Sequence, residues 1–182
     1  MTRWAYIHVG ARRRHPDSDF ESESITALPL LAEALYAFSP QVSLELSTPF
    51  PQKGLWIELG RSAHLFGGET TLLDRILECT RALGFSANAA LANQPETAYL
   101  LAPMASTAPL IVPPGRDTEI LGPLSTSALH PTVKAQKFFK RLGIRTLHDL
   151  AQLSPSSLSQ RLGPEGITLV CLARAHTFPS PR

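Results

Sequence analysis

An acidic stretch near the N-terminus could hold a divalent metal ion. Asp17, Asp19, Glu21 and Glu23 fall at every second position, and carboxylate oxygens are ligands that Mg²⁺ prefers. Metal-assisted catalysis, however, needs carboxylates that rigid elements hold around one point. Residues 17–24 are polar and show neither a helical nor a strand period. We therefore predict a solvated loop here rather than a metal site.

A pair of glycines could bind phosphate. Gly67 and Gly68 follow Leu65-Phe66 and precede Glu69, and backbone N–H groups at the start of a helix favour anions. A phosphate loop of the common type would continue into Lys-Ser or Lys-Thr, which is absent here. We expect a structural role instead: the glycines turn the chain tightly, and Leu65 and Phe66 pack into the core beneath the next helix.

A basic stretch, residues 140–147, reads as two helices joined by a small-residue turn at Gly143. Helix–hairpin–helix modules use such turns, whose free N–H groups at the start of the second helix bind a DNA phosphate without reading sequence. Basic side chains nearby would add to this contact. An ordinary helical corner with a solvated basic face explains the pattern equally well. The candidate DNA-binding residues are Lys137, Lys140, Arg141, Gly143, Arg145 and Thr146.

Histidine and cysteine chemistry finds little support in the sequence. The six histidines show no ligand spacing with the two cysteines, and no nucleophile elbow is present. We predict no metal and no cofactor. Cys79 and Cys171 lie far apart in helix-like patterns, which favours free thiols in a reducing compartment. With no apolar run long enough to span a bilayer and no signal-peptide pattern, we expect a cytoplasmic protein without membrane contact.

The charge is distributed unevenly, although the net charge is only +2. Residues 17–58 hold seven acidic residues against one lysine, whereas residues 134–145 hold five basic residues and no acid. A polyanion is therefore expected to contact the C-terminal third of the chain.

The periodicities predict an α+β fold. Strand patterns cover residues 4–9, 42–46, 55–59 and 85–91, and helical patterns cover residues 24–38, 69–84 and 93–101. This βαββαβ order is that of the ferredoxin-like fold. Residues 1–102 would form this domain and residues 103–128 a Pro-rich connector without packed elements. Residues 129–176 would form a small all-helical module, followed by a frayed tail, 177–182.

The segment Gly54–Gly68 resembles the palm strand and turn of Y-family DNA polymerases. It is most similar to their ImuB branch, the inactive polymerase-like subunit of bacterial damage-induced mutagenesis systems. Weaker similarity continues upstream through residues 35–43 and downstream through residues 83–102. Residues 142–151 and 161–165 resemble the thumb, a helix–hairpin–helix-like module. The resemblance implies a palm-like domain followed by a thumb-like module.

Active members of this family hold two metal ions with an acidic residue on the first palm strand and an Asp-Glu pair just before the second. In this sequence Gly10 and Arg12 occupy the first acidic positions, and the pair would fall in residues 47–53, which contain no acid. Glu58 matches a later acidic position, for which a structural role is expected. The resemblance therefore predicts that the chain is not an enzyme.

The resemblance also implies a shortened relative. Only about 15 residues separate Val9 from the helix near Ile25, where an active polymerase has its fingers, and no little-finger domain is expected after the thumb-like helices.

Three functional hypotheses follow. The first is a non-catalytic protein that supports translesion synthesis or DNA repair, binds DNA weakly, and contacts other mutagenesis or repair subunits. The second is a residual metal-dependent nucleotidyl transferase that uses Asp17, Asp19 and Glu58. The third is a protein-interaction module whose palm-like sheet docks a partner without any DNA contact.

Overall fold

The computed structural model describes residues 2–12, 20–44 and 54–175. The chain divides into two compact units, one from the N-terminus to Val112 and one that begins at Pro113. We call them the sheet unit and the helical unit. No helix in the described ranges is both long enough and apolar enough to cross a membrane.

The sheet unit is built on a five-stranded sheet in the order β2-β3-β1-β4-β5. Strand β1 lies at the centre and pairs antiparallel with β3 and β4, while β5 runs parallel to β4. The predicted α+β class is confirmed, and the sheet has a fifth strand that the sequence did not predict. The strands are β1 (Trp4–Arg12), β2 (Val42–Ser43), β3 (Gly54–Glu58), β4 (Phe85–Ala92) and β5 (Leu110–Ile111).

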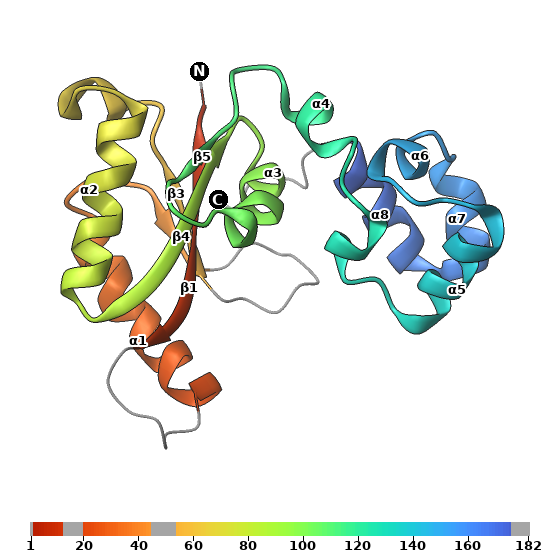
Figure 1. Ribbon diagram of the computed structural model, residues 1–182, viewed down its shortest axis with the longest axis horizontal. Helices are drawn as coiled ribbons and strands as arrows, with labels where there is room; N and C mark the ends of the chain where they lie inside the picture. Colours follow the sequence, from red (N-terminus) through yellow and green to blue (C-terminus); the bar gives the residue numbers. More distant parts are fainter. Residues whose placement is uncertain (1, 13–19, 45–53, 176–182) are drawn as a thin grey trace. The chain divides into compact units, whose positions relative to one another are not determined.

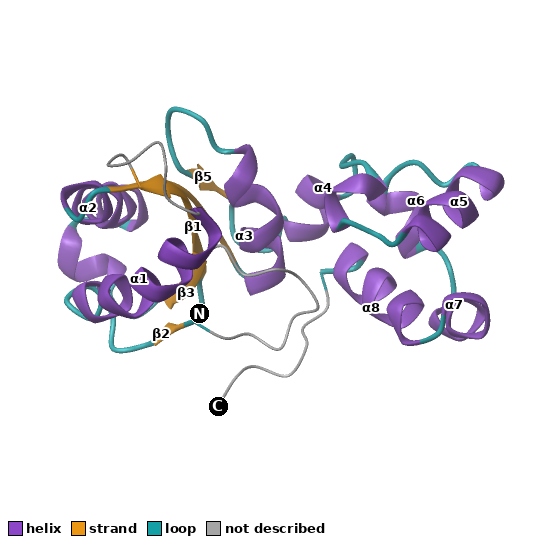
Figure 2. Cartoon of the chain, turned by 90° about the horizontal axis from the view of Figure 1, so that it is seen from below, coloured by secondary structure: helices purple, strands orange, loops and turns teal. Residues whose placement is uncertain are grey.

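Helices cover both faces of this sheet (Figure 1, Figure 2). Helices α1 (Phe20–Leu35) and α2 (Glu69–Ala82) lie on one face, and the short helix α3 (Pro95–Leu101) lies on the other. Alternate strand residues point to each face, so every second residue of β1 enters the α1/α2 core. This core includes the fully buried side chains of Ile7, Leu31, Leu35, Leu55, Ile57, Leu72, Leu73, Ile76, Ala89 and Leu91.

Two predicted element boundaries are wrong. Helix α1 begins at Phe20, not after Ser24. Glu and Ser both tolerate a helical backbone, so the helix extends into a polar stretch that lacks an apolar period. Of the strand predicted over residues 42–46, the structure has Val42–Ser43 as β2 and Leu44 outside it, and residues 45–53 lie outside the described part of the chain.

The Pro-rich stretch 103–128 was expected to hold no packed element, and this expectation is wrong. Strand β5 and helix α4 (Asp117–Leu121) both fall within it. The Val112 N–H donates to the Leu91 carbonyl at 2.8 Å, and the Val112 side chain is buried. Prolines break regular structure only locally, so the residues between them remain free to pair with a sheet edge.

The helical unit packs its short helices around a core of its own. Beyond α4 it contains α5 (Val133–Leu142), α6 (Leu147–Ala151), α7 (Pro155–Leu162) and α8 (Pro164–Ala173). Its buried residues include Leu129, Ala135, Phe139, Leu147, Leu150, Leu158, Leu169, Val170 and Leu172.

A capping box fixes the start of α6. The Thr146 hydroxyl accepts a hydrogen bond from the Asp149 N–H, and the Asp149 carboxylate accepts one from the Thr146 N–H at 3.0 Å. The same carboxylate oxygen accepts a second bond from the Arg145 N–H at 3.1 Å. These reciprocal bonds satisfy donors that a helix start otherwise leaves unpaired. The bonds from the N–H groups of Thr146 and Arg145, followed by the Thr146 hydroxyl, lower the pKa of Asp149.

Replacing Gly54 by alanine should destabilise the sheet unit. A Cβ at this position would lie 1.9 Å from the Ile7 carbonyl oxygen, a backbone atom that cannot move aside easily. Overpacking of this kind costs about 1–3 kcal/mol, which urea unfolding would measure. Gly10→Ala is the matched control on β1, because the atom nearest to its Cβ would be the Ser86 hydroxyl, at 2.7 Å, and the nearest backbone atom would lie 3.6 Å away. Equal losses of stability in the two variants would contradict the close approach at Gly54.

Asp149 should make the stability of the helical unit depend on pH in the acid range. Its pKa is lowered in the folded state, so its contribution is complete above the ordinary value of 3.8 and is lost as the pH falls through the folded-state pKa. Urea unfolding of the wild type and of Asp149→Ala, monitored by the NMR signals of α5 and α6, should give different free energies of unfolding at about pH 7. This difference should be smaller at about pH 3. For the uncharged control Gln152→Ala, the difference in free energy of unfolding from the wild type should not become smaller at low pH. A difference for Asp149→Ala that stays constant with pH would contradict the lowered pKa of Asp149.

Candidate functional site

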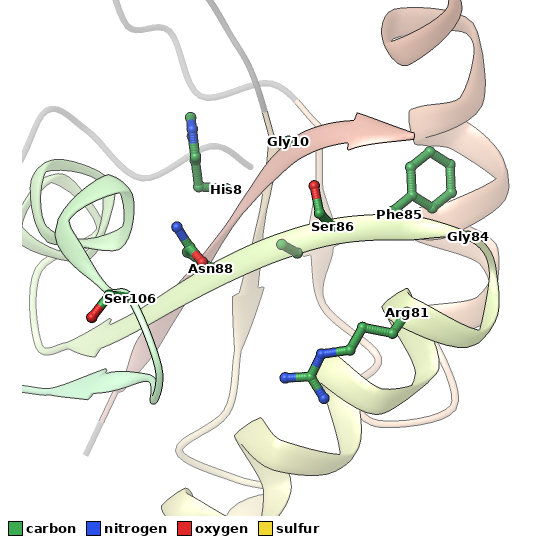
Figure 3. Close-up of a pocket in the computed structure, with 9 residues that line it drawn as sticks. His8, Gly10, Arg81, Gly84, Phe85, Ser86, Asn88 and Ser106 are labelled. Atoms are coloured by element: carbon green, nitrogen blue, oxygen red, sulfur yellow. The ribbon is translucent and has the colours of Figure 1, made fainter. Parts of the chain in front are cut away.

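A polar pocket lies beside strands β1 and β4 (Figure 3). Its volume is about 360 Å³, and its side chains offer hydrogen-bond donors and acceptors together with one guanidinium group. It is lined by His8, Gly10, Arg81, Gly84, Phe85, Ser86, Ala87, Asn88 and Ser106.

The pocket exists because α3 covers only part of its face of the sheet. Tyr6, Trp56 and Tyr99 fill the covered part, with the Tyr6 ring centroid 4.6 Å from that of Trp56 and 4.9 Å from that of Tyr99. Burial raises the pKa of Tyr99 to about 12. Two residues further along β1, His8 is only half-buried, and the pocket begins there.

Gly10, one of the positions at which the resemblance places a metal ligand, lines this pocket. His8 pairs with Gly54, so the far half of β1 lies beside the start of β3. Among the described residues, no group of three or more His, Cys, Asp or Glu side chains is placed to hold a metal ion. Asp17, Asp19 and residues 47–53 lie outside the described ranges. Two of the three carboxylates of the nucleotidyl transferase hypothesis therefore lie outside the described residues, and that hypothesis stays a prediction.

Glu58 lies at the opposite end of β3 and is buried. One of its carboxylate oxygens accepts hydrogen bonds from the Gly60 N–H at 3.0 Å and the Arg3 N–H at 3.3 Å. The Arg3 guanidinium in turn donates to Glu69, Asn93 and the Val112 carbonyl. These bonds join both ends of the sheet unit's sequence at one corner of the sheet.

The turn before α2 was expected to place both Leu65 and Phe66 in the core, and only Phe66 packs there. Gly67 and Gly68 adopt φ values of 85° and 111°, which side chains rarely tolerate. The Phe66 ring packs 5.7 Å from that of Phe38 at the edge of the core. The expectation that Leu65 packs into the core is wrong, because its side chain is 72% exposed. The turn is a short 3-10 helix, Ala63–Phe66, and this tight geometry directs Leu65 outward.

The basic candidate residues lie on α5 and on the turn that follows it. Lys137, Lys140, Arg141 and Arg145 are all exposed, and in the part of the chain that the structure describes they form no ion pair with an acidic side chain. Gly143 ends α5 with a φ of 71°. These cations are therefore available to an external polyanion.

The N–H groups of this turn are not available, contrary to the helix–hairpin–helix expectation. Gly143 and Ile144 donate to carbonyls of α5, and Arg145 and Thr146 donate to Asp149. The next two amides donate to carbonyls outside the hairpin, Leu147 to Leu124 and His148 to Gly122. A phosphate would have to displace a carboxylate of the chain itself, so any DNA contact here depends on side chains.

Sequence reasoning missed Arg81, Asn88 and Ser106 as pocket residues. They come from α2, β4 and the loop after α3, and no motif spacing connects them. Only the pairing of the strands brings them together, so the sequence carried no local signal for this pocket.

Comparison with known proteins gives a consistent result. No family model matches the chain. The chain is 28% identical over 160 residues to Protein ImuB from two strains of Caulobacter vibrioides, NA1000 / CB15N and ATCC 19089 / CB 15. The match covers 85% of this chain but 34% of ImuB, so the chain spans about one third of the length of these curated relatives.

Solved structures share the fold at lower identity. DinB from Sulfolobus solfataricus matches with a TM-score of 0.66 and 15% identity over 84% of this chain and 45% of that one. An insertion ternary complex of Dbh DNA polymerase matches with a TM-score of 0.68 and 14% identity over 87% and 46% of the two chains. A Y-family DNA polymerase chimera of Dbh and Dpo4 matches with a TM-score of 0.67 and 14% identity over the same shares.

These structures contradict the expectation that the chain is not an enzyme. Dbh is a DNA polymerase, and this chain shares the fold of about 46% of it. The described residues do not demonstrate a loss of catalytic residues, because the stretches that carry Asp17, Asp19 and residues 47–53 lie outside them. The resemblance itself is confirmed: the chain is similar to ImuB in sequence and to Y-family DNA polymerases in fold.

Proposed function

We propose that this chain takes part in DNA damage tolerance and that its helical unit contacts the DNA backbone. The similarity to ImuB and the fold shared with DNA polymerases support the role. In this proposal residues 1–102 are palm-like and residues 129–176 are thumb-like. Other mutagenesis or repair subunits are further proposed partners.

The observation that carries the DNA contact is the exposed and unneutralised set Lys137, Lys140, Arg141 and Arg145. The four cations fall within nine consecutive positions that contain no acidic residue. Cations of this kind release condensed counterions from DNA when they neutralise phosphates, which drives association without sequence readout.

The balance of charges argues for weak binding. The net charge of the whole chain is +2, and Asp149 places a carboxylate at the hairpin itself. Because the hairpin amides are bonded within the helical unit, Gly143 and Thr146 shape the turn but supply no free donor. Four side-chain contacts of this type are typical of sequence-independent binding, with dissociation constants of about 10⁻⁴–10⁻⁶ M.

A salt titration tests this proposal. Binding of a fluorescein-labelled primer–template duplex should weaken with salt, with a slope of log affinity against log salt of about −3 to −4 for four phosphate contacts. The double variant Lys137→Ala/Lys140→Ala should reduce the magnitude of the slope by about 2, because each lost contact removes about 1.

Arg116→Gln is the matched control in the same unit, since Arg116 is already paired with Glu119. Its slope should stay at the wild-type value. An unchanged slope in the double variant would contradict the assigned residues. Absence of binding even at about 50 mM salt would instead favour the alternative, a protein-interaction module without DNA contact.

A further inference from the structure

A half-buried aromatic ring lies on the basic helix of the helical unit. Phe138 of α5 is partly accessible to solvent, whereas the next residue, Phe139, is 2% exposed and belongs to the core. The Arg161 guanidinium of α7 lies over the Phe138 ring, with its carbon atom 5.9 Å from the ring centroid. The helices that Figure 1 labels α5 and α7 thus each contribute one side chain to a stacked pair.

Two further cations of α5 flank this pair. Lys134 lies four residues before Phe138 and Arg141 three residues after it, and residues at these spacings are neighbours on one helix face. Both side chains are exposed, as is that of Arg161. Among the residues that the structure describes, none of the three cations forms an ion pair. We call the set Lys134, Phe138, Arg141 and Arg161 the Phe138 surface.

The acidic side chains that follow these two helices are already bonded within the chain. Helices α5 and α7 themselves contain no acidic residue. The Asp149 carboxylate accepts from the N–H groups of Arg145 and Thr146. The Glu165 carboxylate accepts from the N–H and the hydroxyl of Thr132, both at 2.8 Å. The charge of the Phe138 surface therefore fits an external polyanion.

The stacked pair favours one kind of polyanion, a single strand of nucleic acid. Bases of single strands stack on aromatic rings and on arginine guanidinium planes, because every base has a flat face. In a duplex the base faces are covered by the neighbouring pairs, and a protein reaches phosphates and base edges. Phe138 lies on one side of the exposed Arg161 guanidinium, so the other side is accessible to a base. An acidic peptide offers carboxylates but no such face.

We propose that the Phe138 surface binds a single-stranded stretch of DNA, with one base stacked on the Arg161 guanidinium and neighbouring phosphates at Lys134 and Arg141. This inference rests on the proposed function and adds the kind of DNA that the helical unit contacts. The seven positions from Lys134 to Arg141 correspond to about 10 Å along a helix. That length equals about three nucleotides at the 3.4 Å rise of a DNA strand, so a hexanucleotide can cover the surface.

Two single-stranded probes of equal charge separate base stacking from phosphate contact: hexathymidylate, and a hexamer of the same backbone whose sugars carry no base. Each is titrated into the full ¹⁵N-labelled chain at about 50 mM salt, and the α5 amide signals give the dissociation constant. Hexathymidylate should bind at least about fivefold more tightly than the abasic hexamer, the lower end of what stacking of one base contributes. It should also shift the Arg161 Nε–Hε signal. Equal dissociation constants would overturn the inference.

Arg161→Lys keeps the positive charge but removes the planar guanidinium. It should remove most of the preference for hexathymidylate and leave the affinity for the abasic hexamer unchanged. Arg116→Lys is the matched control, because Arg116 is paired with Glu119, and the preference should persist in that variant. A preference that survives Arg161→Lys would make the contact with Phe138 purely structural and would overturn the inference.

Phe138→Leu keeps an apolar side chain but removes the ring that supports the guanidinium, so it should also reduce the preference. If this variant fails to fold, Arg161→Lys decides the question by itself, since Arg161 is exposed.

The probes also distinguish this inference from the proposed function. Binding of the duplex together with equal binding of the two single-stranded probes would overturn the inference alone. No binding of any of the three would overturn both. A capped hexaglutamate peptide that binds more tightly than hexathymidylate would assign the Phe138 surface to an acidic protein partner and would overturn the inference.

Discussion

The position of β1 at the centre of the sheet determines most of this structure. A strand with a partner on each side and helices on each face must bury nearly every side chain, and Trp4 to Ile7 are almost wholly inaccessible to solvent. The two faces receive different side chains, because residues alternate along a strand. Ile7 therefore enters the aliphatic core under α1 and α2, whereas the Tyr6 ring makes tilted contacts with Trp56 and with Tyr99 of α3. The pocket is a consequence of the same alternation, since His8 follows Tyr6 on the α3 face just beyond the covered part.

In the helical unit, local hydrogen bonds fix the turn between α5 and α6, which carries the side chains of the proposed contact. Thr146 and Asp149 close the hairpin through backbone amides that a phosphate could otherwise use. The amides of the turn are occupied by bonds within the chain, and the exposed cations of α5 and Arg145 form the proposed contact surface. A sequence pattern that is typical of phosphate binding by backbone amides is thus found here with those amides already bonded within the chain.

The sequence predicts the classes of element well and the sites poorly, for physical reasons. The α+β order follows from apolar periods in residues such as Leu72, Leu73 and Ile76, whose burial is local to one helix. Strand β5 was missed because the three residues between Pro109 and Pro113 are too few to carry a period. Leu65 was misplaced because hydrophobicity does not reveal the outward direction imposed by a 3-10 turn. Arg81 and Ser106 could not be connected with His8, since only strand pairing brings them to one pocket.

In the proposed function, DNA contacts the helical unit through the side chains of α5 and the following turn. NMR of the chain titrated with a primer–template duplex at low salt tests this directly, with arginine side-chain and backbone signals followed together. We expect the Arg141 and Arg145 Nε–Hε signals to shift, together with the amides of residues 137–145, while the Thr146 and Asp149 amides keep their internal bonds. Shifts confined to the sheet unit, or no shifts at all, would contradict it.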